Sequence, residues 1–161
     1  ESQRGALPPA RRVAAARDLI YQGDMTTTVC DLMQSEVATL RADDHLDLAS
    51  DIMTLGRVRH LPVEENGAVV GVLSQRDLYR AAISSVLQFR PGAEREWLAK
   101  IAVREAMTAP VISASPSTPI AEAAKLLVEK RIGCLPVVEN GRLVGLLSES
   151  DIVRDYVRRQ G

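Results

Sequence analysis

An internal repeat constrains the fold of this chain more than any other feature of its sequence. Residues 59–77 read RHLPVEENGAVVGVLSQRD, and residues 133–151 read GCLPVVENGRLVGLLSESD, so that position 59 corresponds to position 133. The correspondence holds without a gap well upstream, where Met33 pairs with Met107. Because the matched positions include prolines and glycines, chance is a poor explanation, and the chain contains two copies of one structural unit.

The first half of each copy is expected to form a short strand followed by a helix. The strand is predicted at residues 37–40 in the first copy and at residues 111–113 in the second. Apolar residues at helical spacing then follow in both copies: Leu46, Ala49, Ile52 and Met53; Ile120, Ala123, Ala124 and Leu127. Predicted caps precede these helices, namely Asp43 or Asp44 in the first copy and Ser117 or Thr118, with Pro119 in the first turn, in the second.

The second half of each copy is expected to form a hairpin and a second helix. In the first copy the strands are predicted at residues 61–63 and 69–73, joined by Glu-Asn-Gly. Asn-Gly is a strong hairpin signal because both residues tolerate positive φ. The second helix opens at Ser74 in the first copy and at Ser148 in the second. The sequence therefore predicts an α/β (α+β) fold made of two β-α-β-β-α units.

The remaining residues divide the chain into four segments. Residues 1–28 are expected to be a partly helical N-terminal extension, with the helix over residues 11–21. The first unit is predicted at residues 29–83 and the second at residues 104–161. Residues 84–103 form a linker between them, with a helix expected over residues 93–103.

Composition excludes several classes of function. Apolar residues make up 46% of the chain and charged residues 25%, which is typical of a globular protein. The formal net charge of −1 and the five aromatic residues argue against a nucleic-acid partner. Two cysteines are too few for a disulfide framework or a zinc site. No apolar run approaches the roughly 18 residues that span a bilayer, and the chain has no signal-peptide stretch, so we expect a cytoplasmic protein without a membrane partner.

The two copies together resemble a tandem pair of CBS domains, also called a Bateman module. The motifs that carry the resemblance are HLPVEENGAVVGVLSQRD and CLPVVENGRLVGLLSESD, which each contain a Leu-Pro-Val strand, a hairpin and a Gly-x-x-Ser-x-x-Asp run. The resemblance covers roughly residues 30–82 and 104–158. It implies a disc-like pair of units with pseudo-two-fold symmetry and a cleft between them.

The resemblance also implies a function. It predicts a regulatory module that binds an adenosine-containing ligand (AMP, ADP, ATP or S-adenosylmethionine), forms a homodimer and acts on a regulated partner protein. No catalytic residue, no metal ion and no required cofactor is expected. Two other functions remain open. One is a ligand-free interaction scaffold, and the other uses Arg4, Arg11, Arg12 and Arg17 as an arm that binds nucleic acid or a partner.

The best candidate sites lie where each hairpin passes into its second helix. The free amides at a helix start favour anions such as a phosphate. The resemblance implies that Asp77 and Asp151 accept ribose hydroxyls, and that Ser74 and Ser148 contact ribose or phosphate. The same Ser-x-x-Asp spacing is also a variant of the capping box, in which both side chains serve their own helix. The sequence leaves both interpretations open.

Further ligand contacts are implied by the resemblance alone. Strand residues would contact the adenine or the ribose: Val37 and Thr39 in the first copy, Val111 and Ser113 in the second. Apolar walls against the base would come from Leu61, Pro62, Leu135 and Pro136. The alternatives are a half-exposed Thr or Ser in each strand and ordinary core packing of the Leu-Pro pairs.

The two copies differ just before the Leu-Pro pair. The first copy has Arg59 and His60 there, whereas the second has Gly133 and Cys134. The resemblance implies that basic residues at this place point at phosphates, and the forked donors of Arg suit phosphate oxygens. The cleft that contains Arg59 is therefore expected to prefer phosphorylated ligands to adenosine. The other cleft, with Gly133 and Cys134, is expected to discriminate less, to bind more weakly or to stay empty. The alternative is that Arg59 lies on the exposed face of an edge strand and His60 packs.

Overall fold

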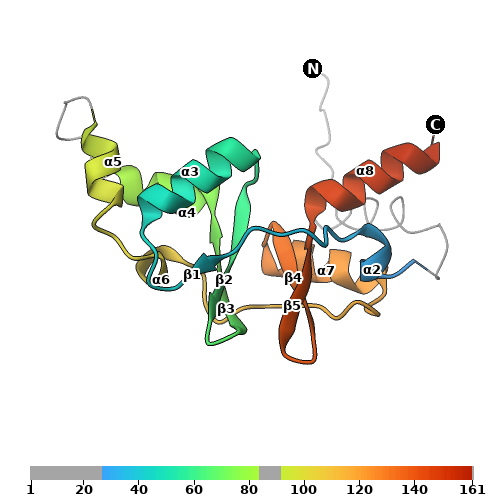
Figure 1. Ribbon diagram of the computed structural model, residues 1–161. Coiled ribbons are helices and arrows are strands. Elements are labelled where there is room, and N and C mark those ends of the chain that lie inside the picture. The colour runs from blue at the N-terminus through green and yellow to red at the C-terminus, as the bar shows by residue number, and fades with distance from the viewer. Residues whose placement is uncertain (1–26, 84–91, 161) are drawn as a thin grey trace, which may run out of the picture.

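The computed structural model describes residues 27–83 and 92–160, which form two similar halves that lie side by side (Figure 1). The first half contains β1 (Leu40–Arg41), α3 (Leu46–Gly56), β2 (His60–Glu65), β3 (Ala68–Ser74) and α4 (Gln75–Ala82). The second contains α7 (Ile120–Lys130), β4 (Cys134–Glu139), β5 (Arg142–Ser148) and α8 (Glu149–Gln160). Shorter helices lie before or between them in sequence: α2 (Val29–Leu32), α5 (Ala93–Leu98) and α6 (Val103–Ala106). The helix predicted over residues 11–21 lies outside the described residues.

The two hairpins confirm the repeat most directly. β2 pairs antiparallel with β3 so that Val63 lies opposite Gly71, and β4 pairs with β5 so that the equivalent Val137 lies opposite Gly145. The turn of the first hairpin has φ values of 53° at Asn66 and 79° at Gly67. These are the positive values that an Asn-Gly hairpin turn requires. The second hairpin has positive φ values at the equivalent positions, 140 and 141.

The first strand of each half is shorter than the sequence predicts and begins later. β1 pairs in parallel with β2 over two residues, and its counterpart is a single parallel bridge between Ala114 and Val137. Residues 37–39 and 111–113 are not in strands. The reason is that these segments run between the halves (Figure 1), where no strand edge of the described structure pairs with them. With this correction, the predicted order β-α-β-β-α is confirmed in both halves.

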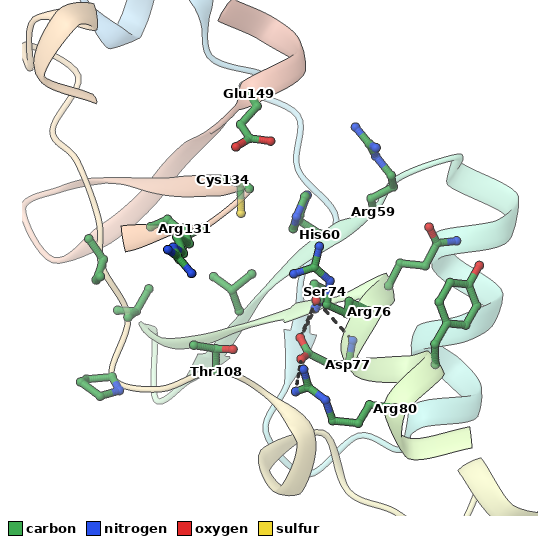
Figure 2. A pocket seen from close by; sticks show the side chains of 18 residues that line it. Arg59, His60, Ser74, Arg76, Asp77, Arg80, Thr108, Arg131, Cys134 and Glu149 are labelled. Carbon is green, nitrogen blue, oxygen red and sulfur yellow. Dashed lines mark hydrogen bonds and ion pairs between the residues drawn. The ribbon is translucent and has the colours of Figure 1, made fainter. Parts of the chain in front are cut away.

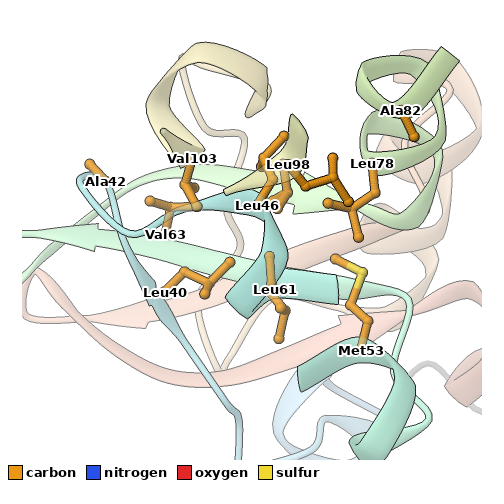
Figure 3. Packing of buried hydrophobic residues seen from close by; sticks show 12 residues of the cluster. Leu40, Ala42, Leu46, Met53, Leu61, Val63, Leu78, Ala82, Leu98 and Val103 are labelled. Atoms are coloured by element: carbon orange, nitrogen blue, oxygen red, sulfur yellow. The ribbon is translucent and has the colours of Figure 1, made fainter. Parts of the chain in front are cut away.

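Each hydrophobic core is completed by a crossing segment. Val29 of α2 lies in the core of the second half. Val103 of α6, at the equivalent position of the repeat, lies with Leu98 in the core of the first half (Figure 3). Buried side chains of the units themselves fill the rest: Leu40, Leu46, Leu61, Val63 and Leu73 in the first core; Leu127, Leu135, Val137 and Leu147 in the second. This exchange holds the two halves together and sets how they face each other.

The predicted side-chain caps of α3 and α7 are wrong. Helix α3 follows His45 and helix α7 follows Pro119, and neither residue makes a side-chain capping bond. The first amide of α3 donates to the carbonyl of Ile101, and that of α7 donates to the carbonyl of Thr27, both at 3.0 Å. Crossing backbone therefore satisfies these helix ends. The predicted caps instead bond within the preceding turns: Asp43, Asp44, Ser117 and Thr118.

The linker helix predicted over residues 93–103 is interrupted between α5 and α6, at residues 99–102. The interruption exposes the carbonyl of Ile101 to the first amide of α3, which a continuous helix would prevent. Helix α5 is held on α3 by a bidentate pair in which Arg95 donates to both carboxylate oxygens of Asp51, at 2.8 and 2.9 Å. Helix α5 therefore packs with the first half.

Candidate functional site

A cavity of about 740 Å³ lies between the two halves (Figure 2). The first half lines it with Arg59, His60, Val72, Ser74, Gln75, Arg76, Asp77, Tyr79 and Arg80. The crossing segment and the second half line it with Thr108, Pro110, Val111, Ile112, Arg131, Ile132, Gly133, Cys134 and Glu149. Its volume falls in the range of small-molecule sites, so it is the candidate ligand site.

The start of α4 presents a serine and a buried carboxylate to this cavity. Oδ2 of Asp77 accepts hydrogen bonds from the backbone N–H of Ser74 at 2.8 Å and from its hydroxyl at 2.6 Å. The amide of Asp77 donates back to Ser74 Oγ at 3.3 Å, so the capping box is present. The other oxygen, Oδ1, faces Nη1 of Arg80 at 3.5 Å. Because a carboxylate oxygen accepts more than one hydrogen bond, Asp77 keeps acceptor capacity at the cavity.

Arginine side chains give the cavity an excess of positive charge. The arginines that line it outnumber the carboxylates: Arg59, Arg76, Arg80 and Arg131 against Asp77 and Glu149. The first-turn amides of α4 add partial positive charge at the same place. Guanidinium groups bind phosphate oxygens with two donors at once. The cavity therefore favours an anionic ligand.

Arg131 reaches the cavity from an unusual backbone conformation. It ends α7 with a φ of 54°, and the equivalent Arg57 ends α3 with a φ of 52°. This left-handed conformation favours glycine at helix ends. An arginine at this helix end in both copies could have indicated a site residue, but the sequence analysis did not single out Arg131. It also missed other lining residues: Arg76, Arg80, Thr108, Ile112, Ile132 and Glu149.

His60 lines the cavity as a neutral ring, in contrast to the basic group that the sequence predicts. Its pKa is lowered from 6.5 chiefly by burial, with a further contribution from the charge of Arg59. The ring lies against Gly133, where an added Cβ atom would be only 2.6 Å from Nε2 of His60. Burial also raises the pKa of the Cys134 thiol to about 12. Both groups are therefore uncharged at neutral pH.

The depressed pKa of His60 predicts a loss of stability in acid. The unfolded chain binds a proton at this residue near pH 6.5, whereas the folded chain binds it only at lower pH. Stability from this group is therefore complete above about pH 6.5 and is lost as the pH falls from there through the folded pKa. The melting temperature of His60→Gln should fall less than that of the wild type between pH 7.5 and pH 5.5. An equal fall in melting temperature for His60→Gln and the wild type would contradict this prediction. The control is His45→Gln, because His45 is exposed.

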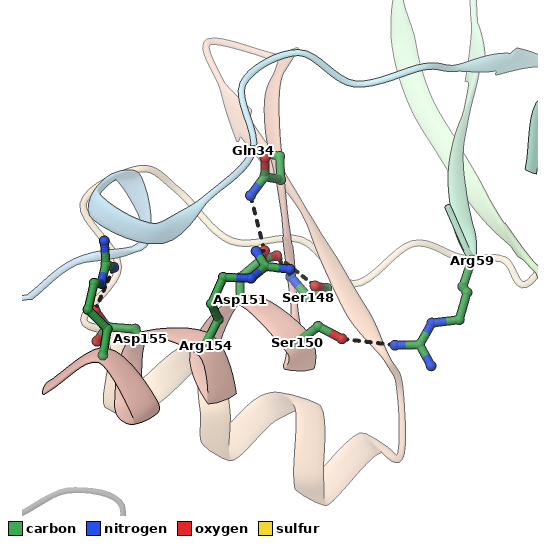
Figure 4. Close-up of polar contacts among 8 residues, drawn as sticks. Gln34, Arg59, Ser148, Ser150, Asp151, Arg154 and Asp155 are labelled. Atoms are coloured by element: carbon green, nitrogen blue, oxygen red, sulfur yellow. Dashed lines mark hydrogen bonds and ion pairs between the residues drawn. The ribbon is translucent and has the colours of Figure 1, made fainter. Parts of the chain in front are cut away.

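The structure corrects the predicted assignment of Arg59 and His60 to one cleft and of Gly133 and Cys134 to the other. All four residues line the same cavity, because the equivalent segments meet where the two halves face each other. Arg59 is also engaged: its Nη2 donates to Oγ of Ser150 on α8 at 2.8 Å (Figure 4). Arg59 therefore links the halves at the edge of the cavity.

The second Ser-Asp pair has the same local geometry but is not among the residues that line this cavity. Asp151 is 7% exposed, and its Oδ2 accepts from the backbone N–H and the hydroxyl of Ser148 at 2.9 and 2.6 Å. Its Oδ1 accepts from Nε2 of Gln34 and from Nη1 of Arg154, each at 3.1 Å (Figure 4). Side chains of the protein thus engage both oxygens of Asp151.

The predicted apolar walls lie elsewhere. Leu61 and Leu135 are 1% and 0% exposed in the two cores, and the prolines that follow them, Pro62 and Pro136, are buried as well. These four residues are not among those that line the cavity, whose apolar surface comes instead from Val72, Ile112 and Ile132. Among the predicted strand residues only Val111 lines the cavity; the others lie in the crossing segments or beside them: Val37, Thr39 and Ser113.

The described residues offer no group of three or more His, Cys, Asp or Glu side chains placed to hold a metal ion. Within the same part of the chain, no helix combines the length and the apolar composition that crossing a membrane requires.

Comparisons with known proteins find related sequences of two kinds. YhcV of Bacillus subtilis, a CBS domain-containing protein, is 29% identical over 126 residues, which are 78% of this chain and 83% of YhcV. A homoserine O-acetyltransferase of Methanococcoides burtonii is 35% identical over 130 residues, which are 80% of this chain but 24% of that enzyme. The chain thus spans about a quarter of this enzyme's length, and the similarity is confined to that part of it.

A solved structure has the same fold. The CBS domain pair of protein MJ0100, in complex with 5′-methylthioadenosine and S-adenosyl-L-methionine, is 25% identical to this chain, with a TM-score of 0.70. The match covers 83% of this chain and 98% of that one. The family model described as CBS domain matches this chain twice, at residues 29–84 and at residues 103–158. The chain therefore belongs to the CBS domain family and contains a tandem pair of these domains.

Proposed function

We propose that this protein is a regulatory module that binds an adenosine-containing ligand (AMP, ADP, ATP or S-adenosylmethionine) in the cavity at Ser74 and Asp77. One observation carries the proposal. Asp77 is a buried carboxylate at the cavity, with Oδ2 satisfied by Ser74 and Oδ1 3.5 Å from Arg80. A carboxylate oxygen with free acceptor capacity suits a pair of ribose hydroxyls, because both hydroxyls are donors.

The rest of the cavity supports the same class of ligand. Val72, Ile112 and Ile132 provide apolar surface for a base, with Val111 beside them. Arg59, Arg76 and Arg131 provide donors for phosphate oxygens. The adenosyl ligands of the MJ0100 domain pair support an adenosine ligand here by analogy. The ligand is regulatory in this proposal: it changes how the two halves face each other, and a partner protein responds.

A thermal-shift titration with AMP, ADP, ATP, S-adenosylmethionine and NADH tests this function. A ligand that binds only the folded state stabilises it by about 2.7 kcal/mol at a hundred times its Kd, so the melting temperature should rise with concentration. If none of the five raises it at millimolar concentration, the second candidate, a ligand-free interaction scaffold, replaces the proposal.

A phosphate preference is expected from the arginines, and Arg59 is the residue to test. Arg59→Ala should lower the affinity for AMP several-fold and leave the affinity for adenosine unchanged, because only AMP carries the charge that Arg59 attracts. The wild-type preference for AMP over adenosine should also shrink in high salt, which screens phosphate attraction. Calorimetric titration of both ligands at two salt concentrations measures this. An unchanged AMP-to-adenosine ratio in Arg59→Ala would leave Arg59 with its contact to Ser150 alone.

A homodimer is part of the proposal. Helix α4 and the residue that follows it expose Tyr79 and Ile83 by 62% and 66%, and α8 exposes Val153 and Val157, at the equivalent positions, by 60% and 63%. Matched apolar pairs on both second helices suit a symmetric contact between two chains. Light scattering should give twice the chain mass for the wild type, and the monomer mass for Ile83→Glu combined with Val157→Glu. A monomeric wild type at micromolar concentration would contradict the homodimer.

A further inference from the structure

We call each Ser-Asp pair at a helix start a corner: Ser74 and Asp77 form the first corner, Ser148 and Asp151 the second. The two corners make equivalent hydrogen bonds but differ in one neighbouring side chain. Beside the first corner, Thr108 and Val72 exchange two backbone hydrogen bonds, at 2.9 and 3.1 Å. Beside the second, Gln34 and Leu146 exchange the same two bonds, both at 2.9 Å. Because Gln34 follows Met33 and Thr108 follows the equivalent Met107, the two residues occupy the same position of the repeat.

Close packing holds this position equally firmly in both halves. An added Cβ on Gly71 would lie 2.6 Å from Sδ of Met107 and 2.9 Å from the carbonyl oxygen of Thr108. On Gly145 it would lie 2.6 Å from Sδ of Met33 and 2.8 Å from the carbonyl oxygen of Gln34. The backbone is therefore anchored in the same way at both corners, and the length of the side chain decides what reaches the carboxylate.

The glutamine reaches it. Nε2 of Gln34 donates to Oδ1 of Asp151 at 3.1 Å, and Nη1 of Arg154 binds the same oxygen at 3.1 Å (Figure 4). At the first corner Thr108 lines the cavity, and Oδ1 of Asp77 has the equivalent Arg80 at 3.5 Å (Figure 2). The oxygen proposed to accept ribose hydroxyls thus accepts a bond from Gln34 at Asp151, whereas at Asp77 it faces the more distant Arg80 beside the cavity.

The residues around the two corners also differ at two further positions of the repeat. Arg76, which lines the cavity beside Asp77, has Ser150 at the equivalent position. Pro110, also in the cavity lining, has Glu36 as its equivalent. Ser150 is in addition bound by Arg59 at 2.8 Å. Arg59 thus brings positive charge to the second corner, and an anionic ligand that uses this guanidinium must displace its bond to Ser150.

We infer that the side chain of Gln34 takes the place of a ligand at Asp151. Each chain consequently binds one adenosine ligand, at Asp77. This inference rests on the proposed function. Gln34 supplies to Asp151 the kind of donor that a ribose hydroxyl would supply, so ligand binding at that corner gains little and loses an existing bond. Residue 34 and residue 108 together determine which of the two Ser-Asp corners is used.

Exchange of the two residues tests the inference, because each copy of the repeat supplies the control for the other. In calorimetric titration with AMP, the wild type should bind one nucleotide per chain. Gln34→Thr, which introduces the residue of the open corner, should bind a second one. Thr108→Gln should lose affinity at the first site by about tenfold or more. Gln34→Ala is a second variant that removes the same donor, and melting curves without nucleotide establish that each variant is folded.

The outcomes separate this inference from the proposed function. A wild type that binds none of AMP, ADP, ATP and S-adenosylmethionine overturns both. A wild type that binds two AMP molecules per chain overturns the inference and leaves the function intact. One bound AMP in the wild type and still only one in folded Gln34→Thr and Gln34→Ala also overturns the inference alone. Two bound AMP molecules per chain in Gln34→Thr and Gln34→Ala, with one in the wild type, support the inference.

Discussion

Replacing Asp77 by Ala is expected to weaken AMP binding about 10- to 150-fold, because hydrogen bonds to a charged group contribute about 1.5–3 kcal/mol. The carboxylate lies at the cavity, and its Oδ1 is the acceptor proposed for the ribose. The loss should be seen in calorimetry as a higher Kd, with the number of sites unchanged.

Asp151→Ala is the matched control for this prediction. Asp77 and Asp151 both bind the backbone N–H and the hydroxyl of the serine three residues before them. Both variants therefore lose the same contacts at a helix start, which lowers stability by about 0.5–2 kcal/mol. Only Asp77→Ala should lose AMP affinity. Equal AMP affinity in the two variants would mean that these carboxylates serve their helices alone.

Replacing Leu61 by Ala is expected to lower the free energy of unfolding by about 3–5 kcal/mol. Leu61 is 1% exposed in the first core, and truncation of a buried leucine removes apolar contacts and leaves a cavity. Leu55→Ala on α3 is the matched control, because Leu55 is 85% exposed and Ala favours a helix. Urea denaturation with a common m-value measures both. A loss below about 1 kcal/mol for Leu61→Ala would contradict the core assignment.

Local patterns were sufficient to predict the elements that depend on local chemistry. The Asn-Gly pairs predicted the two hairpins because the turn conformation is a property of those two residues. Ser74 predicted the start of α4 because a serine cap and its partner three residues later act within one helical turn. The repeat then transferred each assignment to the second copy, so the fold class followed from one unit.

Contacts between distant segments could not be predicted in this way. The first amide of α3 is satisfied by Ile101, and no spacing rule connects those positions, so the side-chain caps were wrong. Residues 37–39 have strand-like composition but run between the halves, where no strand of the described structure pairs with them. The hydrogen bond from Gln34 to Asp151 joins two positions that lie far apart in the sequence. Such pairs depend on how the halves cross, which a single sequence does not reveal.

The sequence predicted the part of the candidate site at the start of α4. It did not predict the residues that face this helix start from the second half. Ser74 and Asp77 were singled out by their motif, and both line the cavity. Arg131 and Ile132 come from the other half, where they follow a helix rather than open one. A motif that describes a strand and a helix start contains no information about the side chains that face it from another unit.

The most direct measurement of the central claim, that Asp77 binds a ribose in this cavity, compares AMP with 2′,3′-dideoxy-AMP. In the wild type, the analogue should bind about tenfold or more weakly, because it lacks both donors to the carboxylate. In Asp77→Ala, the two nucleotides should bind with equal affinity, since the carboxylate that accepts from the hydroxyls is gone. Loss of the hydroxyls and loss of the carboxylate remove the same interaction, so their effects are not additive. Equal affinities in the wild type, or an undiminished preference for AMP in Asp77→Ala, would contradict the claim.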